Sequence, residues 1–191
     1  AQPSMIYAIG QAFMRWDTTA ISTGMVSKDL VANNRSFAIN WHDTGHWDVN
    51  LSSDGSSFSE NAFDSSWTPT VDTWYHIAIT RDGSDNVRLW IDGTQSGSTQ
   101  SISTDIYNGT AKLVFGGNDA GATFTGYMDE MRVSDTCRYT GSFTPTIVQF
   151  TSDSNTMVLI HSDMSSGAGE DVSGNDNHFT NNTVATSTHT P

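Results

Sequence analysis

The residues that could bind a metal ion are aspartates and asparagines near Gly-rich loops. Asp129 lies in a predicted strand, where it shares one face with Tyr127 and Met131. A buried carboxylate there is costly unless it is hydrogen-bonded to loop amides or bound to a metal. The loops 116–119 and 171–177 supply the hard oxygen ligands that calcium prefers. We therefore predict a structural Ca²⁺ site, with ligands drawn from Asp129, Asp119, Asp171 and Asn175.

Aromatic side chains form the second group with binding chemistry, because the chain has six tryptophans and five tyrosines. Sugar recognition uses exposed aromatic faces with Asp and Asn acceptors close by. Three tryptophans lie near predicted turns and loops and are candidates for glycan binding, with core packing as the alternative: Trp41, Trp47 and Trp67. Trp74 and Trp90 lie within predicted strands, where we expect them to pack in the core.

Two histidines flank a predicted turn. His42 and His46 have the His-x-x-x-His spacing, with Asp43 between them. Such a pair on a loop could bind a transition metal, but we favour a solvated turn.

The carboxylates do not form a catalytic pair. A retaining glycosidase needs two carboxylates about 5 Å apart, and the three glutamates, Glu60, Glu130 and Glu170, are widely separated in the chain. Asp129 and Glu130 are adjacent and would point to opposite faces of a strand. The chain has no G-x-S-x-G nucleophile elbow, and we expect His76 to be a structural residue that makes a hydrogen bond. The prediction is a non-enzymatic protein.

Length and charge limit the classes of function. The chain has 191 residues, typical of one domain with additional segments, and a net charge of −13 from 8 basic and 21 acidic residues. This charge excludes general nucleic-acid binding, because little is available to neutralise phosphates. It also disfavours docking on anionic membranes, and no apolar run is long enough to span a bilayer. The single cysteine, Cys137, excludes an internal disulfide.

The elements that position these residues are predicted to be strands. Short segments with period-two alternation are separated by turn-forming residues at roughly ten-residue spacing, which is typical of a β-sandwich. No segment has sustained helical periodicity. The predicted strands cover residues 36–41, 47–51, 74–81, 87–92, 111–115, 124–133 and 157–161.

Three of these segments resemble one family. The runs 73–81 (TWYHIAITR), 87–93 (VRLWIDG) and 126–133 (GYMDEMRV) are similar to the strands of laminin-G-like, concanavalin A-like domains. The resemblance implies an all-β fold with two antiparallel sheets in a jelly-roll sandwich, over roughly residues 10–145. Such domains often hold a structural calcium near these elements.

A narrower resemblance concerns the C-terminal part. The runs 133–145, 158–163 and 171–178 are similar to segments that follow such domains in large bacteriophage virion proteins, notably of marine phages. We therefore predict a sandwich over residues 1–145, a linker over 146–155, and an edge strand with a Gly/Asn-rich tail over 156–191. The last segment would open a following module or supply the missing edge strand to this domain or to a neighbouring copy. The chain is expected to begin past the domain's first strand, as a processed or excised piece of a longer polypeptide.

The resemblance implies a virion structural and adhesion module, in a tail fibre or a capsid surface decoration. Its expected partners are other virion subunits and a host-surface glycan, in a homo-oligomer at the virion surface. One alternative is a carbohydrate-binding accessory module of a secreted bacterial polysaccharide enzyme. Another is an architectural subunit that polymerises by strand exchange.

Overall fold

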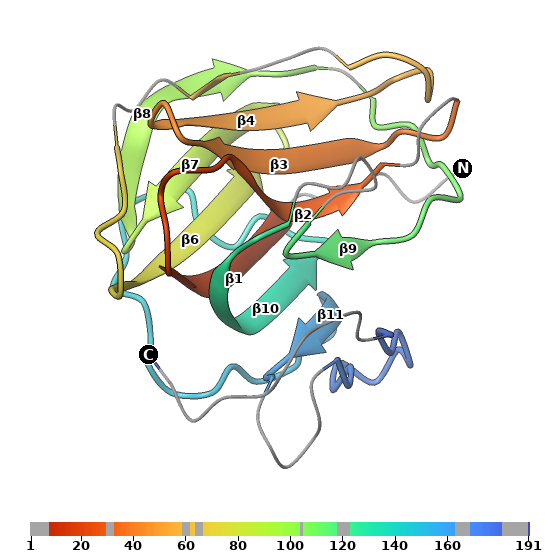
Figure 1. Ribbon diagram of the computed structural model, residues 1–191. Helices are drawn as coiled ribbons and strands as arrows, with labels where there is room; N and C mark the ends of the chain where they lie inside the picture. The colour runs from red at the N-terminus through yellow and green to blue at the C-terminus, as the bar shows by residue number, and fades with distance from the viewer. Residues whose placement is uncertain are drawn as a thin grey trace. The chain divides into compact units, whose positions relative to one another are not determined.

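The computed structural model describes residues 8–29, 33–58, 62–63, 67–103, 105–117, 123–162, 169–180 and 191. All regular secondary structure in these residues is β-strand (Figure 1). The strands are β1 (Ala8–Trp16), β2 (Thr23–Lys28), β3 (Phe37–His42), β4 (His46–Leu51), β5 (Ala62–Phe63), β6 (Trp74–Arg81), β7 (Asn86–Ile91), β8 (Thr94–Ser101), β9 (Val114–Phe115), β10 (Gly126–Ser134) and β11 (Thr156–Ile160).

The first sheet has six strands in the order β11-β10-β1-β6-β7-β8. Strand β1 pairs antiparallel with β6, with Phe13 opposite His76. The sequence analysis did not predict β1, because its residues are apolar on both faces and do not alternate: Ala12, Phe13 and Met14 are all buried. Polar β8 was also missed, since most of its side chains are exposed and it has no hydrophobic face.

The second sheet has five strands in the order β5-β4-β3-β2-β9, and its central feature is the β3–β4 hairpin. The hairpin pairs Phe37 with Leu51 at one end and His42 with His46 at the other. Residues 43–45 form a three-residue loop, in which Gly45 has a φ of 85°. Glycine suits this left-handed position, and the loop places the two histidines directly opposite each other. Both strands were predicted to within one residue at each end.

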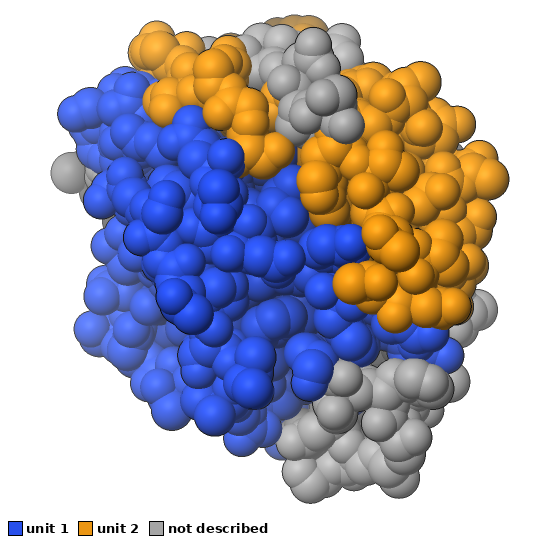
Figure 2. All heavy atoms as spheres, turned by 90° about the vertical axis from the view of Figure 1, so that its left-hand side faces the viewer, with its two compact units in different colours: residues 1–15, 74–95, 127–191 blue, residues 16–73, 96–126 orange. Residues whose placement is uncertain are grey.

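The described residues belong to two compact units, shown in Figure 2. Unit 1 contains residues 1–15, 74–95 and 127–191, and unit 2 contains residues 16–73 and 96–126. In unit 2 the fully buried Trp16 makes edge-to-face contacts with Trp41 and Trp47, at centroid distances of 6.1 and 6.3 Å. In unit 1 the largest fully buried side chain is Trp90, whose indole nitrogen donates a hydrogen bond to Thr80.

The segment predicted as a linker contributes a buried residue to unit 1. Phe150 is 6% exposed and packs with Phe13 and Leu159. Beyond it, β11 pairs antiparallel with β10, with Met131 opposite Ile160 and Val133 opposite Val158. In this chain, therefore, residues 156–160 take the edge position of their own six-stranded sheet.

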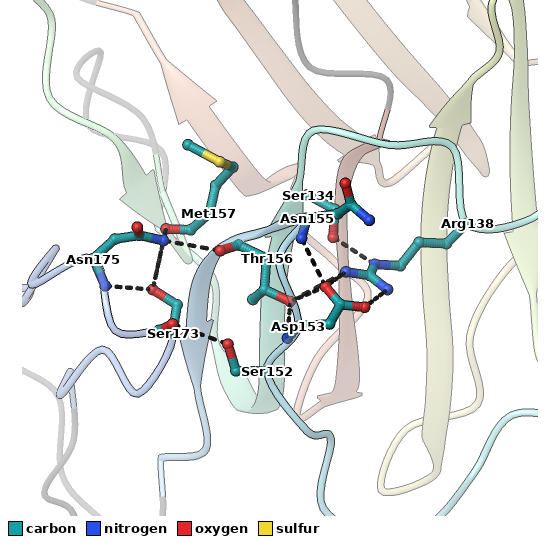
Figure 3. Close-up of polar contacts among 9 residues, drawn as sticks. All are labelled: Ser134, Arg138, Ser152, Asp153, Asn155, Thr156, Met157, Ser173 and Asn175. Carbon is teal, nitrogen blue, oxygen red and sulfur yellow. Dashed lines mark hydrogen bonds and ion pairs between the residues drawn. The ribbon is translucent and has the colours of Figure 1, made fainter.

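A polar network holds the start of β11 (Figure 3). Arg138 donates to both carboxylate oxygens of Asp153, at 2.8 and 2.9 Å, and to the hydroxyls of Ser134 and Thr156. The Arg138 hydrogen bonds hold the pKa of Asp153 well below its usual range. Arg138 belongs to the run 133–145, which resembles virion proteins, and its hydrogen bonds to Asp153 hold the turn before β11.

Candidate functional site

The candidate site is the polar face of the β3–β4 hairpin in unit 2. Alternate residues of the two strands face the same side, and cross-strand pairing puts Asn40 opposite Asp48 and His42 opposite His46. The other face of the same strands carries apolar residues such as Ile39 and is buried. The hairpin therefore presents a row of amide, carboxylate and imidazole groups backed by core residues.

The carboxylate of Asp48 is the centre of this row. Asp48 is 4% exposed, and its Oδ2 lies 2.5 Å from Nε2 of His42. Its Oδ1 lies 3.5 Å from Nε2 of His46 and has no hydrogen-bond partner among the described residues. The side-chain oxygen of the neighbouring Asn40 is also buried without a hydrogen-bond partner. Buried polar atoms in native proteins usually have partners, so these two oxygens lack the hydrogen bonds that their burial calls for.

Two of the predicted sugar platforms are buried. Trp41 and Trp47 are 0% exposed, because they alternate onto the apolar face of the hairpin and pack against Trp16. The expectation that their rings face solvent is wrong, since position near a turn does not decide which face of a strand a side chain occupies. A role as a sugar platform would need an exposed ring face, which neither residue has.

Trp67, the third predicted platform, is partly exposed. Its ring lies near-parallel to that of Trp47, with a centroid distance of 6.3 Å and an interplanar angle of 29°. Its backbone oxygen accepts a hydrogen bond from the indole of Trp41. Its ring also makes an edge-to-face contact with Trp16, at a centroid distance of 5.9 Å. These contacts place Trp67 against the apolar face of the hairpin, opposite the polar row, and sugar contact through Trp67 stays a prediction.

The buried acid of β10 is Glu130 and not Asp129. Glu130 is 7% exposed and has a φ of 52°, which interrupts the regular alternation on which the prediction for Asp129 rested. Asp129 is half-buried, and its Oδ1 accepts a hydrogen bond from the amide of Glu130. This contact is of the amide-capping kind considered as the alternative to calcium.

The other predicted calcium ligands are engaged by the protein. Both Asp171 oxygens accept hydrogen bonds, from the amides of Leu159, Ser173 and Asn177 and from the Ser173 hydroxyl. Burial alone would raise the pKa of Asp171, but these hydrogen bonds lower it below its ordinary value.

Asn175 turns its amide nitrogen, which cannot bind calcium, toward the backbone oxygens of Thr156 and Met157 (Figure 3). As they lie, Asp171 and Asn175 do not fit a shared calcium site. Asp119 lies outside the described residues. Calcium stays a prediction, which melting with and without a chelator would test.

Sequence reasoning missed several residues with binding chemistry. Asp48 and Asn40 were detectable from the period-two spacing Asn40-x-His42 and His46-x-Asp48, which puts four polar groups on one face. In unit 1 the guanidinium of Arg15 lies 4.8 Å from the ring centre of Tyr127, which contacts Trp74. That cluster joins strands distant in sequence, so no local pattern pointed to it. His76 is buried as expected, but its Nδ1 has no hydrogen-bond partner.

A family model supports the resemblance found in the sequence. The model of the concanavalin A-like lectin/glucanases superfamily matches residues 11–141. No curated protein sequence matches the chain significantly. In the part of the chain that the structure describes, no helix is long and apolar enough to span a membrane.

Solved structures share the fold at low sequence identity. A protein of Bacteroides ovatus described as carbohydrate-binding matches with a TM-score of 0.68 and 16% identity, over 92% of this chain and 52% of its own. The chain thus spans about half the length of that protein. The CBM40 domain of a Ruminococcus gnavus sialidase, bound to α2,3-sialyllactose, matches with a TM-score of 0.57 and 11% identity, over 72% of this chain and 80% of its own.

A third structure is domain 4 of an extracellular arabinanase from Geobacillus stearothermophilus, in complex with arabinotriose. It matches with a TM-score of 0.52 and 20% identity, over 74% of this chain and 64% of its own. Together with the family model, these structures confirm the predicted fold class, an all-β two-sheet antiparallel jelly roll.

Proposed function

Because the chain belongs to the concanavalin A-like lectin/glucanase superfamily, we propose that it is a non-catalytic module that binds a glycan through the polar face of the β3–β4 hairpin. The observation that carries the proposal is the unpartnered Asn40 and Asp48 oxygens beside the half-exposed His42 and His46. Sugar hydroxyls donate and accept hydrogen bonds, and such acceptors suit them.

The neighbours in fold support a glycan as the ligand class. Their descriptions mention carbohydrate binding, sialyllactose or arabinotriose. At these identities they support the fold, and the ligand of this chain is inferred from its own side chains. The arabinanase is described as extracellular, which is compatible with a module exposed outside a cell.

The larger assembly is proposed on the sequence alone. The runs 133–145, 158–163 and 171–178 resemble segments of phage virion proteins, which supports display at a virion surface with other virion subunits as partners. An accessory module of a secreted polysaccharide enzyme would use the same glycan-binding face. Binding to purified host-surface glycans favours the first role, and binding to soluble plant or microbial polysaccharides favours the second.

A glycan array with the purified chain tests the proposal, with sialyllactose and arabino-oligosaccharides among the probes. Calorimetry then compares two variants with matched controls on unit 1. Asn40→Ala is expected to weaken binding about tenfold or more, by roughly 1.4 kcal/mol. Trp67→Ala, at the opposite face of the hairpin, tests separately the predicted contact of Trp67 with a sugar. Trp74→Ala and Asn155→Ala should leave it unchanged. Binding that is lost in the controls but kept in the hairpin variants would place the site elsewhere.

An architectural subunit is the second candidate, and the edge position of β11 favours it. An edge strand can pair with another chain, and Met157 on β11 is 40% exposed. Native mass spectrometry separates the candidates. A concentration-independent monomer that binds sugar supports the glycan module, and an oligomer that binds none supports the architectural role.

A further inference from the structure

We propose that His42, His46 and Asp48 form a binding site for a divalent transition metal of the zinc class. One atom from each side chain contributes to a group whose members all lie within 4.8 Å of one another. Among the described residues, this is the one group of three or more His, Cys, Asp or Glu side chains with that geometry. The metal site does not depend on sugar binding.

The hairpin builds the site by strand geometry. The three-residue loop 43–45 puts the two histidines directly opposite each other, and their rings stack with a centroid distance of 4.4 Å and an interplanar angle of 4°. Asp48 follows His46 by two residues and so faces the same side. The turn that we interpreted as merely solvated therefore brings two imidazoles and a carboxylate together.

The nitrogen atoms that face the carboxylate suit metal binding. Nδ1 of His46 lies 2.7 Å from the hydroxyl of Thr44, and Nδ1 of His42 lies 3.4 Å from the hydroxyl of Ser22. In metal sites the second ring nitrogen usually has such a partner, which orients the ring and directs the other nitrogen at the metal. Here both Nε2 atoms point toward Asp48, whose Oδ1 has no hydrogen-bond partner.

The ligand spacings match a small metal ion. Ligands held about 2.0–2.1 Å from zinc in a tetrahedron lie about 3.3 Å from one another. The Nε2–oxygen distances of 2.5 and 3.5 Å, to the two different oxygens of Asp48, bracket that value. Because the three ligand atoms lie within 4.8 Å of one another, shifts of about 1–2 Å complete the set. Two imidazoles favour zinc, nickel, copper or iron over calcium and magnesium, which prefer oxygen ligands. Three protein ligands leave at least one coordination position open to water or to a bound molecule.

Titration of the purified, chelator-treated chain with Zn²⁺ tests the site by calorimetry and by melting temperature. We expect one zinc ion per chain and a higher melting temperature with zinc. The variants His46→Gln and Asp48→Asn are each expected to weaken zinc binding at least tenfold, and His178→Gln, an exposed histidine on unit 1, should leave it unchanged. Melting without zinc shows that each variant is folded.

Cobalt provides a readout on the unaltered chain, because bound Co²⁺ should give the visible absorption of a site with nitrogen and oxygen ligands and zinc should displace it. Absence of zinc binding at millimolar concentration would overturn the proposal. Zinc affinity that survives both hairpin substitutions, or falls as far in His178→Gln, would also overturn it.

Discussion

Buried carboxylates lie beside histidines in both units, but they differ in which of their atoms the protein already uses. In unit 1, Oε2 of Glu130 accepts a hydrogen bond from the amide of Phe150, at 2.6 Å. The other oxygen, Oε1, lies 2.8 Å from Nδ1 of His161. In unit 2 one oxygen of Asp48 has no hydrogen-bond partner. A buried carboxylate beside a histidine therefore holds a backbone amide in unit 1, as Glu130 does, and faces a candidate binding site in unit 2, as Asp48 does.

The histidines show the same contrast. His76 in unit 1 is 1% exposed and lies among the rings of Phe13, Phe143 and Phe150. His42 and His46 in unit 2 each expose about a third of their side chains, 32%. A histidine packed among aromatic rings contributes to the core, whereas a half-exposed pair beside a carboxylate can take up a ligand. Residue type alone does not separate these roles.

The largest expected effect is at Glu130. Glu130→Ala removes the acceptor for the Phe150 amide and the partner of His161, and leaves both polar groups buried. Breaking a buried pair in this way typically costs about 3–5 kcal/mol of unfolding free energy. Urea denaturation measures the loss. A loss below about 1 kcal/mol would show that this acid does not fasten the chain.

Acid should destabilise the fold through His76. Burial, together with the nearby charge of Arg132, lowers the pKa of His76 to about 4 from 6.5. Between these values the unfolded chain binds a proton at this site that the folded chain does not. The stability contributed by neutral His76 is therefore complete above about pH 6.5 and is lost as the pH falls toward 4.

The full loss amounts to about 3 kcal/mol. Denaturation curves between pH 7 and 4 should show a smaller pH dependence in His76→Phe than in the unaltered chain. Equal slopes in the two proteins would mean that His76 titrates in the folded state as it does in the unfolded state.

The smallest effects come from a matched pair of substitutions. Asp171→Asn weakens the acceptors for the amides of Leu159, Ser173 and Asn177 and should cost about 2 kcal/mol. Asp48→Asn removes a charge whose partners are half-exposed histidines, and stability should change by less than about 1 kcal/mol. Chemical denaturation of both variants measures the difference. If Asp48→Asn lowers the unfolding free energy more than Asp171→Asn does, Asp48 stabilises the fold, and the proposed difference between the two acids is wrong.

The sequence predicted strands best where apolar residues alternate with residues of other types. Strand β6 was predicted at residues 74–81, as observed, because Tyr75, Ile77 and Ile79 alternate with other residues. Strand β1 was missed because Ala12, Phe13 and Met14 are consecutive apolar residues, all buried, and interrupt any alternation. A strand without alternation has no period-two signal to detect.

The sites were predicted less well than the fold. Trp41 and Trp47 face the core, and Trp67 packs against Trp47 and Trp16 on the same face of the hairpin. A shift of one residue along a strand reverses the face that a side chain occupies. The alternation at Asp129 was broken by the left-handed backbone of Glu130, which no composition rule predicts. Asp171 was predicted as a calcium ligand, and its hydrogen bond from the amide of Leu159 on β11 was not foreseen, because that residue lies on another element.

By itself the sequence determined the all-β class, the family, the approximate ranges of several strands and a turn flanked by His42 and His46. These follow from local periodicity, turn chemistry and motif spacing, which act over a few residues. Only the tertiary structure decided which carboxylate oxygens accept hydrogen bonds from the protein and which have no such donor. That depends on whether amides from distant segments reach a given oxygen, as Phe150 reaches Glu130 and none of the described groups donates to Oδ1 of Asp48.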